Sequence, residues 1–491
     1  MRSCRRPATL VATVVVGMTA CGQESVTYKT EPLSVLEDKI RGGWAGQMIG
    51  VSFGEPTEFR YLDRIIPEEE LPEWRPEMVA STLNQDDLYV DMTFAAVLDE
   101  KGLDATTDDF GAMFRDAEYR LWHANLAARR ALRRGVPATL SGTPEYNSHA
   151  NDIDFQIEAD FIGLMSPGMP QASNDICLRA GRVMNHGDGI LGGVFVSGMY
   201  SAAFFESDLR RIVEAGLATI DEKWNAREPC PAGALHPFNI DAKINGAYVA
   251  LGLLYGNSDF HDTMAIATRA GQDSDCNPAS AAGVLGVMTG YSGIPDEFKS
   301  GIGAIANEKF SYTDYTFNTI VASTMDRTIA LVERNGGRVE GDSIVVPIQT
   351  PKPVQLELWD DYGSPVERIP VDDPRWTFTG DWAEGWGGQS TGTEGAEAAI
   401  GFEGTGVIIG GTYLSSGGTA DIYLDGELRS TVDVYSDEDG DKYGESVWHV
   451  FGLENGEHEV RVVVKGEPYR GIGGEESNGT NVSLAYLVVF R

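Results

Sequence analysis

The chain has 491 residues, in which 38 Lys and Arg stand against 74 Asp and Glu, so the formal net charge is −36, and 42% of the residues are hydrophobic. This length suits two or three domains, and the composition is that of a globular protein with a strongly acidic surface. Nucleic acid and anionic membrane surfaces are excluded as main partners, because both require positive charge on the protein.

Residues 1–21 predict a lipoprotein signal peptide. A positive segment with three arginines precedes an apolar core over 8–16, which is too short to span a bilayer. The run 18–22 (MTACG) resembles a bacterial lipobox in which Cys21 is lipidated; ordinary secretion is the alternative. We therefore expect an exported protein in the periplasm or on the cell surface, held at the membrane only by a lipid on Cys21 and followed by a linker over 22–33.

The other cysteines of the mature chain are too few for a disulfide framework. Cys177, Cys230 and Cys276 are an odd number, so one bridge is allowed and the sequence does not say which. Cys276 adjoins an aspartate and could act as a nucleophile, but a small packed residue at a helix start is the favoured interpretation.

Apolar residues three and four positions apart predict an all-α domain over residues 34–340. Many of the predicted segments end near glycine, and their small residues permit close helix contacts. The expected helices are 35–49, 88–99, 110–132, 190–205, 209–224, 240–255, 260–270 and 279–289.

The pattern changes to short runs of β-branched and aromatic residues after residue 340. Residues 341–370 are predicted as connecting strands, and 371–491 as an antiparallel β-sandwich of the jelly-roll type, with turns such as Asp425-Gly426 between strands. The fold class is therefore multidomain, an all-α domain followed by a β-sandwich.

An acidic loop over 271–280 separates two of the predicted helices. Asp273 and Asp275 lie two residues apart, Asn277 is a good N-cap for the following helix, and the loop contains no basic residue. Such carboxylates repel each other unless a cation lies between them, and their oxygens suit Mg²⁺, Mn²⁺ or Ca²⁺. Ordinary turn residues are the alternative.

Two further acidic features precede this loop in the chain. Asp86 and Asp87 begin the helix after Gln85, and Asp91 lies four residues after Asp87 on the same helix face; a capped, solvated helix is the alternative. Glu58 lies in a tight turn with apolar neighbours, where its pKa could rise, although an exposed loop glutamate has the same pattern.

The middle of the helical region offers a fourth group of polar residues. His186 and Asp188 precede the helix 190–205 and could contact substrate, although a lone histidine is more often structural. Asp154 and Glu158 are four residues apart in a segment whose period fits a strand as well as a helix, and the helical surroundings favour a helix.

The order of these motifs resembles the ADP-ribosylglycohydrolase family over residues 38–300. The motifs are GEPTEF, QDD, NHGD and GQDSDCN, and the last one, followed by an Ala/Gly helix, is the most specific. The resemblance implies an orthogonal α-helical fold with a two-metal site, usually Mg²⁺, that cleaves an α-linked glycosidic bond at ribose C1. It implies Asp86, Asp87, Asp273 and Asp275 as metal ligands and places Glu58 near the scissile bond. It also matches His186 to the histidine of a Thr-His element in the middle of the family's sequences.

Three positions depart from the family's pattern. Gln85 and Leu88 replace threonines, and of the two only Gln85 offers an oxygen. Cys276 replaces a hydroxyl ligand, and sulfur is a poor ligand for Mg²⁺. We therefore expect one or two divalent ions, with Asp91 as a hypothetical substitute ligand.

These residues support metal-assisted hydrolysis of a glycoside. A metal would polarise a sugar hydroxyl and lower the pKa of the attacking water, and a carboxylate would act as acid or base across the bond. The predicted roles are catalytic for Glu58, Asp87 and Asp154, metal-binding for Gln85, Asp86, Asp87, Asp273 and Asp275, and substrate-binding for His186, Asp188 and Asn277.

Export favours an extracellular glycan or glycoside as substrate, with a furanoside as the favoured form. The appended sandwich resembles galactose-binding-like, carbohydrate-binding modules, whose tryptophans stack on sugars or fill the core; here they are Trp376, Trp382, Trp386 and Trp448. The loop 436–441 is either a Ca²⁺ site or a solvated acidic turn. The rival functions are a true ADP-ribosyl hydrolase and a non-catalytic, glycan-binding surface lipoprotein.

Overall fold

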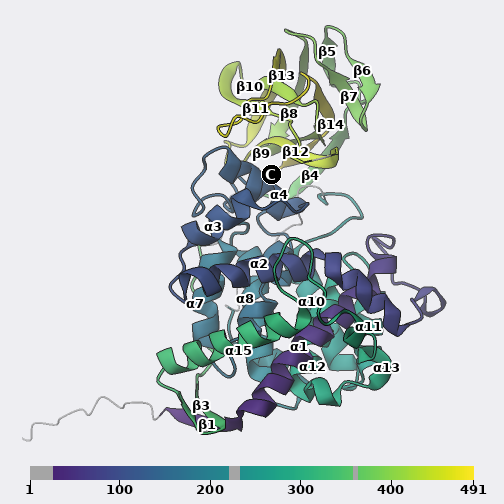
Figure 1. The fold of residues 1–491 in the computed structure, drawn as a ribbon. Coiled ribbons are helices and arrows are strands. Elements are labelled where there is room, and N and C mark those ends of the chain that lie inside the picture. The colour runs from purple at the N-terminus through teal and green to yellow at the C-terminus, as the bar shows by residue number, and fades with distance from the viewer. Residues whose placement is uncertain (1–25, 221–232, 358–362, 439) are drawn as a thin grey trace, which may run out of the picture.

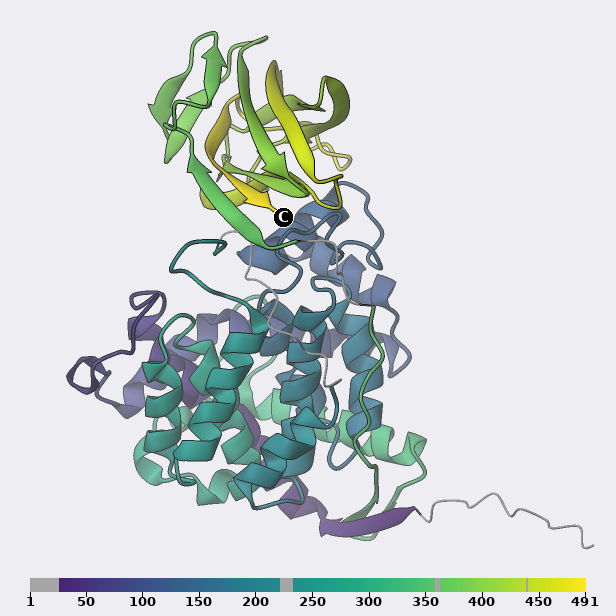
Figure 2. The same cartoon turned by 180° about the vertical axis from the view of Figure 1, so that it is seen from behind.

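The computed structural model describes residues 26–220, 233–357, 363–438 and 440–491 (Figures 1 and 2). The predicted signal peptide, the lipidation site Cys21 and Cys230 lie outside these ranges. A helical body and a β-sandwich are stacked end to end, with α3 and α4 next to the sandwich (Figure 1). No helix among the described residues combines the length and the apolar character that crossing a membrane requires.

Helices make up the body over the region predicted as all-α. The α-helices are α1 (Leu33–Gly54), α2 (Asp86–Lys101), α3 (Thr107–Asp116), α4 (His123–Arg133), α5 (Asp154–Ile157), α6 (Asp160–Leu164), α7 (Pro170–Gly181), α8 (Asp188–Ala203), α9 (Leu209–Leu217), α10 (Ala242–Tyr255), α11 (Phe260–Arg269), α12 (Cys276–Thr289), α13 (Asp296–Lys299), α14 (Ile302–Ile305) and α15 (Phe317–Arg334). Short 3₁₀ helices cover Glu55–Thr57, Glu68–Glu70, Pro76–Asn84 and Tyr291–Gly293.

Two of the differences from the predicted helix boundaries affect the site. The segment 110–132 forms two helices, α3 and α4, because Ala117 and Trp122 take extended backbone conformations (ψ 142° and 171°). α12 begins at Cys276 with Asp275 as its N-cap residue, two residues before the expected cap Asn277. Asp275 therefore lies directly at a helix N-terminus, where negative charge is favourable.

A stripe of glycines brings α1 and α12 into close contact. Gly42, Gly46, Gly50 and Gly54 are four residues apart, and a Cβ on any of them would overlap the backbone of α12 or of the loop before it. The two helices run antiparallel, since the start of α1 faces the end of α12. The end of α1 therefore lies beside the loop that carries Asp273.

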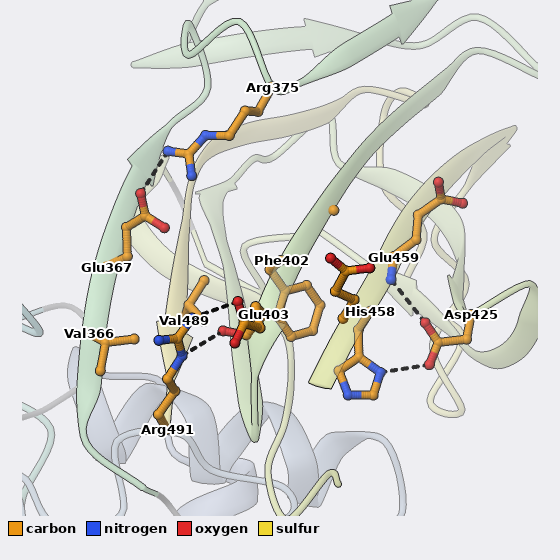
Figure 3. Close-up of a pocket in the computed structure, with 12 residues that line it drawn as sticks. Val366, Glu367, Arg375, Phe402, Glu403, Asp425, His458, Glu459, Val489 and Arg491 are labelled. Atoms are coloured by element: carbon orange, nitrogen blue, oxygen red, sulfur yellow. Dashed lines mark hydrogen bonds and ion pairs between the residues drawn. The ribbon is translucent and has the colours of Figure 1, made fainter. Parts of the chain in front are cut away.

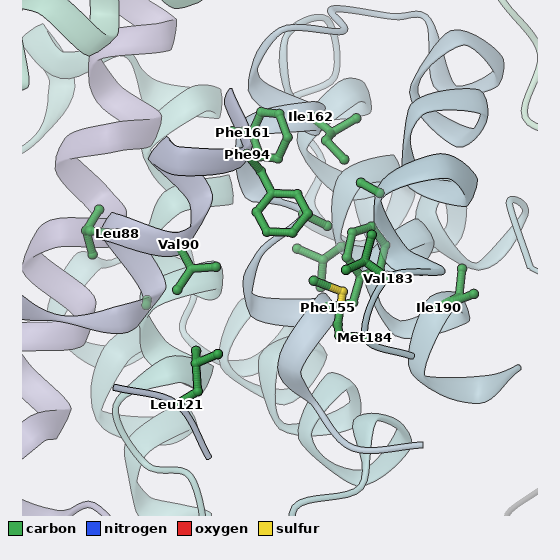
Figure 4. Close-up of a cluster of buried hydrophobic side chains, with 14 of the residues drawn as sticks. Leu88, Val90, Phe94, Leu121, Phe155, Phe161, Ile162, Val183, Met184 and Ile190 are labelled. Atoms are coloured by element: carbon green, nitrogen blue, oxygen red, sulfur yellow. The ribbon is translucent and has the colours of Figure 1, made fainter. Parts of the chain in front are cut away.

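Apolar side chains from α2, α5, α6 and α8 fill the centre of the body (Figure 4). Phe94 stacks on Phe110 with ring centroids 5.5 Å apart, and Phe155, Phe161 and Ile190 are fully buried. Each such side chain contributes about 1.5–3 kcal/mol to folding by its burial. This core fixes the helix ends that carry the acidic residues.

The predicted linker over 22–33 is wrong for its second half. β1 (Thr27–Pro32) pairs antiparallel with β3 (Ser343–Ile348), which also pairs with β2 (Arg338–Glu340). The side chains of β1 are mostly exposed, so its sequence looks like a linker although its backbone bonds to the buried strand β3. This pairing ties the start of the helical domain to its end.

Two antiparallel sheets form the sandwich, with strand orders β11-β10-β13-β8-β5 and β12-β9-β14-β7-β6. Pro365–Pro370, predicted as part of a connection, is strand β4 and pairs with β14. The strands are β4 (Pro365–Pro370), β5 (Thr377–Thr379), β6 (Ala383–Gly385), β7 (Gly388–Thr391), β8 (Glu397–Gly404), β9 (Gly406–Tyr413), β10 (Gly418–Leu424), β11 (Glu427–Asp433), β12 (Lys442–Val450), β13 (Gly456–Pro468) and β14 (Val482–Phe490).

Ion pairs join the sandwich to α4. Arg130 and Arg134 each contact both Asp433 and Asp437, at distances between 2.6 and 3.1 Å. Arg129 pairs with Glu438. Within the described part of the loop 436–441, Asp437 and Glu438 are thus paired with arginines, which does not fit the Ca²⁺ site or the solvated turn that the sequence suggested for these two acids.

Candidate metal and glycoside site

A cavity of about 430 Å³ opens at the end of the helical body that faces the sandwich. The turn that follows α1, the starts of α2 and α4, and α5 contribute to it, together with the loop before α12. Its lining consists of Glu58, Phe59, Asn84, Gln85, Asp86, Tyr89, Leu121, Trp122, His123, Asn125, Ile153, Asp154, Ile157, Phe238, Ile240, Asp273 and Cys276.

Carboxylates from three separate segments meet at one end of this cavity. Ligand atoms of Glu58, Asp273 and Asp275 lie within 4.8 Å of one another, and so do those of Asp87, Asp275 and Cys276. Asp275 belongs to both groups. The arrangement therefore offers two adjacent positions for a cation, both built from residues at helix ends.

Backbone bonds fix the loop of Glu58 to the loop of Asp273. The amide of Phe59 donates to the Gln272 carbonyl (3.0 Å), and the amide of Gln272 donates to the Tyr61 carbonyl (2.9 Å). Gly271 and Gln272 both have positive φ (76° and 57°), a conformation that glycine adopts without strain. A hydroxyl contact between Thr57 and Ser274 (2.9 Å) adds a side-chain link.

Burial raises the pKa values of these acids. Asp273 and Asp275 are each 2% exposed. Burial first, and then the charges of Glu58 and Asp87, raise the pKa of Asp273 to about 8. Glu58 is exposed in the cavity, but crowding by surrounding atoms and the charges of Asp275 and Asp86 raise its pKa to about 9. The cluster thus resists carrying its full negative charge.

The donor set fits a hard divalent cation. One buried oxygen each of Asp87, Asp273 and Asp275 has no hydrogen-bond partner in the described part of the chain. Unpaired buried carboxylate oxygens are costly, and Mg²⁺, Mn²⁺ or Ca²⁺ would satisfy them. Cys276 instead uses its thiol to contact Asp87 (Sγ to Oδ2, 3.3 Å).

Asp91 lies behind the cluster and is held by other partners. Its Oδ2 accepts from the Gln47 amide and from the Phe161 backbone N–H, both at 3.2 Å. It belongs to neither ligand group. The geometry therefore gives no support to Asp91 as a substitute ligand.

Asp154 occupies a structural position beside the cavity. It accepts the backbone N–H of Asn125 (2.9 Å) and that of Ala124 (3.3 Å), at the first turn of α4. Burial and the charge of Asp152 raise its pKa to about 8. Asp154 thus anchors the start of α4, although it also lines the cavity.

The remaining predicted site residues fall into two sets. Gln85 and Asp86 line the cavity, and the Asp86 carboxylate lies outside the two ligand groups. His186, Asp188 and Asn277 are not among the lining residues: the Asp188 carboxylate pairs with Lys243 (2.7 Å), and the Asn277 amide donates to the Asn245 carbonyl (2.9 Å) and to the Asp273 carbonyl. Asn277 therefore braces the loop that carries Asp273 instead of facing the cavity.

An aromatic wall in the same cavity was missed by the sequence analysis. His123 stacks on Phe238 with ring centroids 5.3 Å apart, Phe59 contacts both rings, and Trp122 lies next to His123 in the chain. Burial and the charge of His149 lower the pKa of His123 to about 3, so its ring is neutral. The density of aromatic residues from Tyr119 to His123 was the available signal, but it was read as part of a helix.

A second cavity, of about 620 Å³, lies on the sandwich (Figure 3). Its charged residues largely pair with one another: Glu367 with Arg375 (2.8 Å), Asp425 with His458 (2.7 Å) and Glu403 with Arg491 (3.4 Å). None of the four tryptophans considered above lines it, and of these only Trp386 is well exposed. The aromatic rings in its lining are therefore Phe402 and His458 instead of a tryptophan.

Comparison with known proteins gives partial matches. A 128-residue segment is 31% identical to "A type blood alpha-D-galactosamine galactosaminidase" of Flavonifractor plautii, covering 25% of this chain and only 10% of that protein. An "ADP-ribosylglycohydrolase-related protein complex" aligns at 16% identity over 60% of this chain and 98% of its own (TM-score 0.37). The CBM36-1 domain of a multidomain xylanase from the hindgut metagenome of Trinervitermes trinervoides aligns at 15% identity, over 25% and 94% (TM-score 0.17).

The family assignment comes from a separate match, which covers more than half of the chain. The family model for ADP-ribosylglycohydrolase matches residues 32–324, which span the helical body from α1 into α15 and include every residue of the carboxylate cluster. The chain belongs to the ADP-ribosylglycohydrolase family.

Proposed function

We propose that this protein is an exported, divalent-metal-dependent glycoside hydrolase that acts on an uncharged glycoside of an extracellular glycan. The observation that carries this proposal is the pairing of a carboxylate cluster with an aromatic wall in one cavity. Aromatic faces stack on sugar rings. The described lining residues include no Lys or Arg, which a diphosphate-linked substrate would call for.

The residues divide the chemical work as follows. Asp87, Asp273 and Asp275 would hold the ion, which when bound acts as a Lewis acid and lowers the pKa of water. Glu58 is the one member of the cluster exposed in the cavity, so it is the carboxyl group that a substrate can reach. Its carboxyl group can exchange a proton with the substrate there, as a general acid or base must.

Family membership favours a second candidate, a hydrolase of ADP-ribosyl groups on proteins or small molecules. The third candidate, a non-catalytic glycan-binding lipoprotein, would not need the unpaired carboxylates. Export and attachment through Cys21 rest on the sequence of the first 22 residues.

One substrate panel separates the first two candidates. It holds α- and β-4-nitrophenyl pyranosides and furanosides, an N-acetyl-α-galactosaminide suggested by the named relative, and ADP-ribosyl-arginine, each with Mg²⁺, Mn²⁺, Ca²⁺ or EDTA. We expect a glycoside to be cleaved only with a divalent ion. Cleavage of ADP-ribosyl-arginine alone would overturn the proposal, and calorimetry without ion binding would favour the non-catalytic candidate.

A further inference from the structure

The sandwich holds the segment that forms the outer wall of the cavity. Residues 117–122 join α3 to α4 without helical structure, and Leu121, Trp122 and His123 line the cavity. The backbone N–H of Leu121 donates to Glu438 Oε1 (3.1 Å), and its carbonyl accepts from Lys442 Nζ (2.9 Å). Both polar backbone groups of this wall residue thus bond to side chains of the sandwich.

Lys442 also fixes the ring next to Leu121. Its Nζ lies 4.2 Å from the centroid of the Trp122 ring and 2.9 Å from Glu438 Oε2. Lys442 is only 7% exposed, and a desolvated ammonium attracts an aromatic face more strongly than an exposed one. Trp122 keeps 42% of its surface exposed, so part of the ring is open to a ligand in the cavity.

Side chains of α4 and of the sandwich bond to the backbone of the wall segment. Its carbonyls at Ala117 and Tyr119 accept from the guanidinium of Arg129, and that guanidinium pairs with Glu438. Glu438 therefore connects to the wall both directly, through Leu121, and through Arg129. Removing the sandwich contacts would leave the segment 117–122 without several of the bonds that define its conformation.

We infer that Trp122 forms a sugar-binding subsite at the mouth of the cavity, and that Lys442 and Glu438 of the sandwich are positioning residues for it. The ligand class is an uncharged saccharide ring next to the bond that is cleaved, so the inference rests on the proposed function. The sandwich is then a wall of the catalytic unit, in contrast to a carbohydrate-binding module that swings on a linker.

Kinetics test the subsite. The substrate is the 4-nitrophenyl glycoside that wild-type protein cleaves with the highest kcat/KM, and the variants are Trp122→Ala, Lys442→Met and the control Lys465→Met, a sandwich lysine paired with Glu467. We expect Trp122→Ala and Lys442→Met to raise KM at least about fivefold with kcat within about twofold, because substrate binding is lost and the metal cluster is untouched. A KM within twofold of wild type for Trp122→Ala would overturn the subsite.

Hydrogen exchange tests the positioning without any substrate. We expect the backbone amides of 117–122 to exchange at least about tenfold faster in Lys442→Met and in Glu438→Gln, but not in Lys465→Met. Unchanged exchange in both variants would overturn the role of the sandwich whatever the kinetics show. If wild-type protein cleaves no glycoside, the proposed function fails, while faster exchange would still support the role of Lys442 and Glu438. Unchanged exchange elsewhere in the helical body verifies that the variants fold.

Discussion

Two clusters of buried acids in this protein have opposite electrostatic environments. At the junction with the sandwich, arginines of α4 neutralise Asp433, Asp437 and Glu438, and the charges of Arg130 and Arg134 overcome the effect of burial to hold the pKa of Asp433 at about 2. In the cavity, Asp273 has no cationic partner among the described lining residues, and burial raises its pKa to about 8.

The difference separates a structural role from a functional one. Acids that must stay charged in a folded protein are paired with cations, as at the junction. The cavity cluster lacks such pairs and has buried oxygens without hydrogen bonds, an arrangement that persists only if something outside the chain compensates it. In the sequence, both places show the same feature, closely spaced Asp and Glu residues, so this feature alone does not separate the two roles.

The largest expected effect follows from removing one carboxylate of the cavity cluster. Asp273→Asn should lower kcat/KM by a factor on the order of 100 or more and weaken Mg²⁺ binding, because the ion loses a charged ligand. Calorimetry and steady-state kinetics measure both. The melting temperature in EDTA should not fall, since Asn has nearly the shape of the protonated, uncharged carboxyl group that a pKa of about 8 gives Asp273 at neutral pH.

Asp296→Asn is the matched control, because this aspartate is 94% exposed and faces solvent. Both variants should fold alike. An Asp273→Asn protein with wild-type turnover and Mg²⁺ affinity would remove the basis for assigning the cluster to an ion.

Substitutions at the junction with the sandwich should change the free energy of unfolding and leave metal binding unchanged. Arg130→Met leaves Asp433 and Asp437 with one fewer cation in a buried setting, which should cost about 3–5 kcal/mol in the free energy of unfolding. Denaturant unfolding gives this value. Arg375→Met, which breaks the exposed pairs with Glu367 and Asp373, should cost about 0–1 kcal/mol. Equal losses in the two variants would contradict the contrast.

The pH dependence of stability should also differ with and without metal. An acid whose pKa is raised by folding binds its proton more tightly in the folded state, so stability falls as pH rises from its unfolded to its folded pKa. Between pH 7 and 8.5 the unfolded carboxyls and histidines are already deprotonated, whereas folded Asp154 and Asp273, with pKa values of about 8, still titrate.

The melting temperature in EDTA should therefore drop by about a few degrees across this range. Saturating Mg²⁺ should flatten the curve, because the ion holds the ligand carboxylates deprotonated and compensated. A metal-free protein whose melting temperature rises over the same range would show that these acids are charged without an ion.

The order of the helical and β-sheet domains and the position of the acidic loop with Asp273 and Asp275 could be predicted from the sequence, because both depend on local patterns. Helical periodicity before residue 340, and two aspartates on a glycine-flanked turn at Asp273 and Asp275, are visible in short windows. The close contact of α1 with α12 then brings Glu58 to them.

What could not be predicted depends on pairs far apart in the chain. Arg130 and Asp433 are 303 positions apart, and Asp437 pairs with the same arginine, so nothing near these two acids in the sequence reveals that they are paired. The aromatic wall joins Phe59, His123 and Phe238 from three segments, and the prediction of a continuous helix over 110–132 concealed His123. His186 was chosen by motif, and the fold keeps it out of the cavity lining.

The smallest effect concerns the sulfur atom in the otherwise oxygen-rich cluster. Cys276→Ser replaces the thiol in the group with Asp87 and Asp275 by a hydroxyl of similar size. Because Mg²⁺ prefers oxygen ligands and softer ions tolerate sulfur, Mg²⁺ affinity should rise by up to about tenfold, while affinity for Zn²⁺ should fall. Competition calorimetry with the two ions measures the ratio. Cys177→Ser, which changes the other described buried thiol, should leave that ratio unchanged. If Cys276→Ser also leaves it unchanged, the thiol does not contact the ion, and its contact with Asp87 serves only to order that carboxylate.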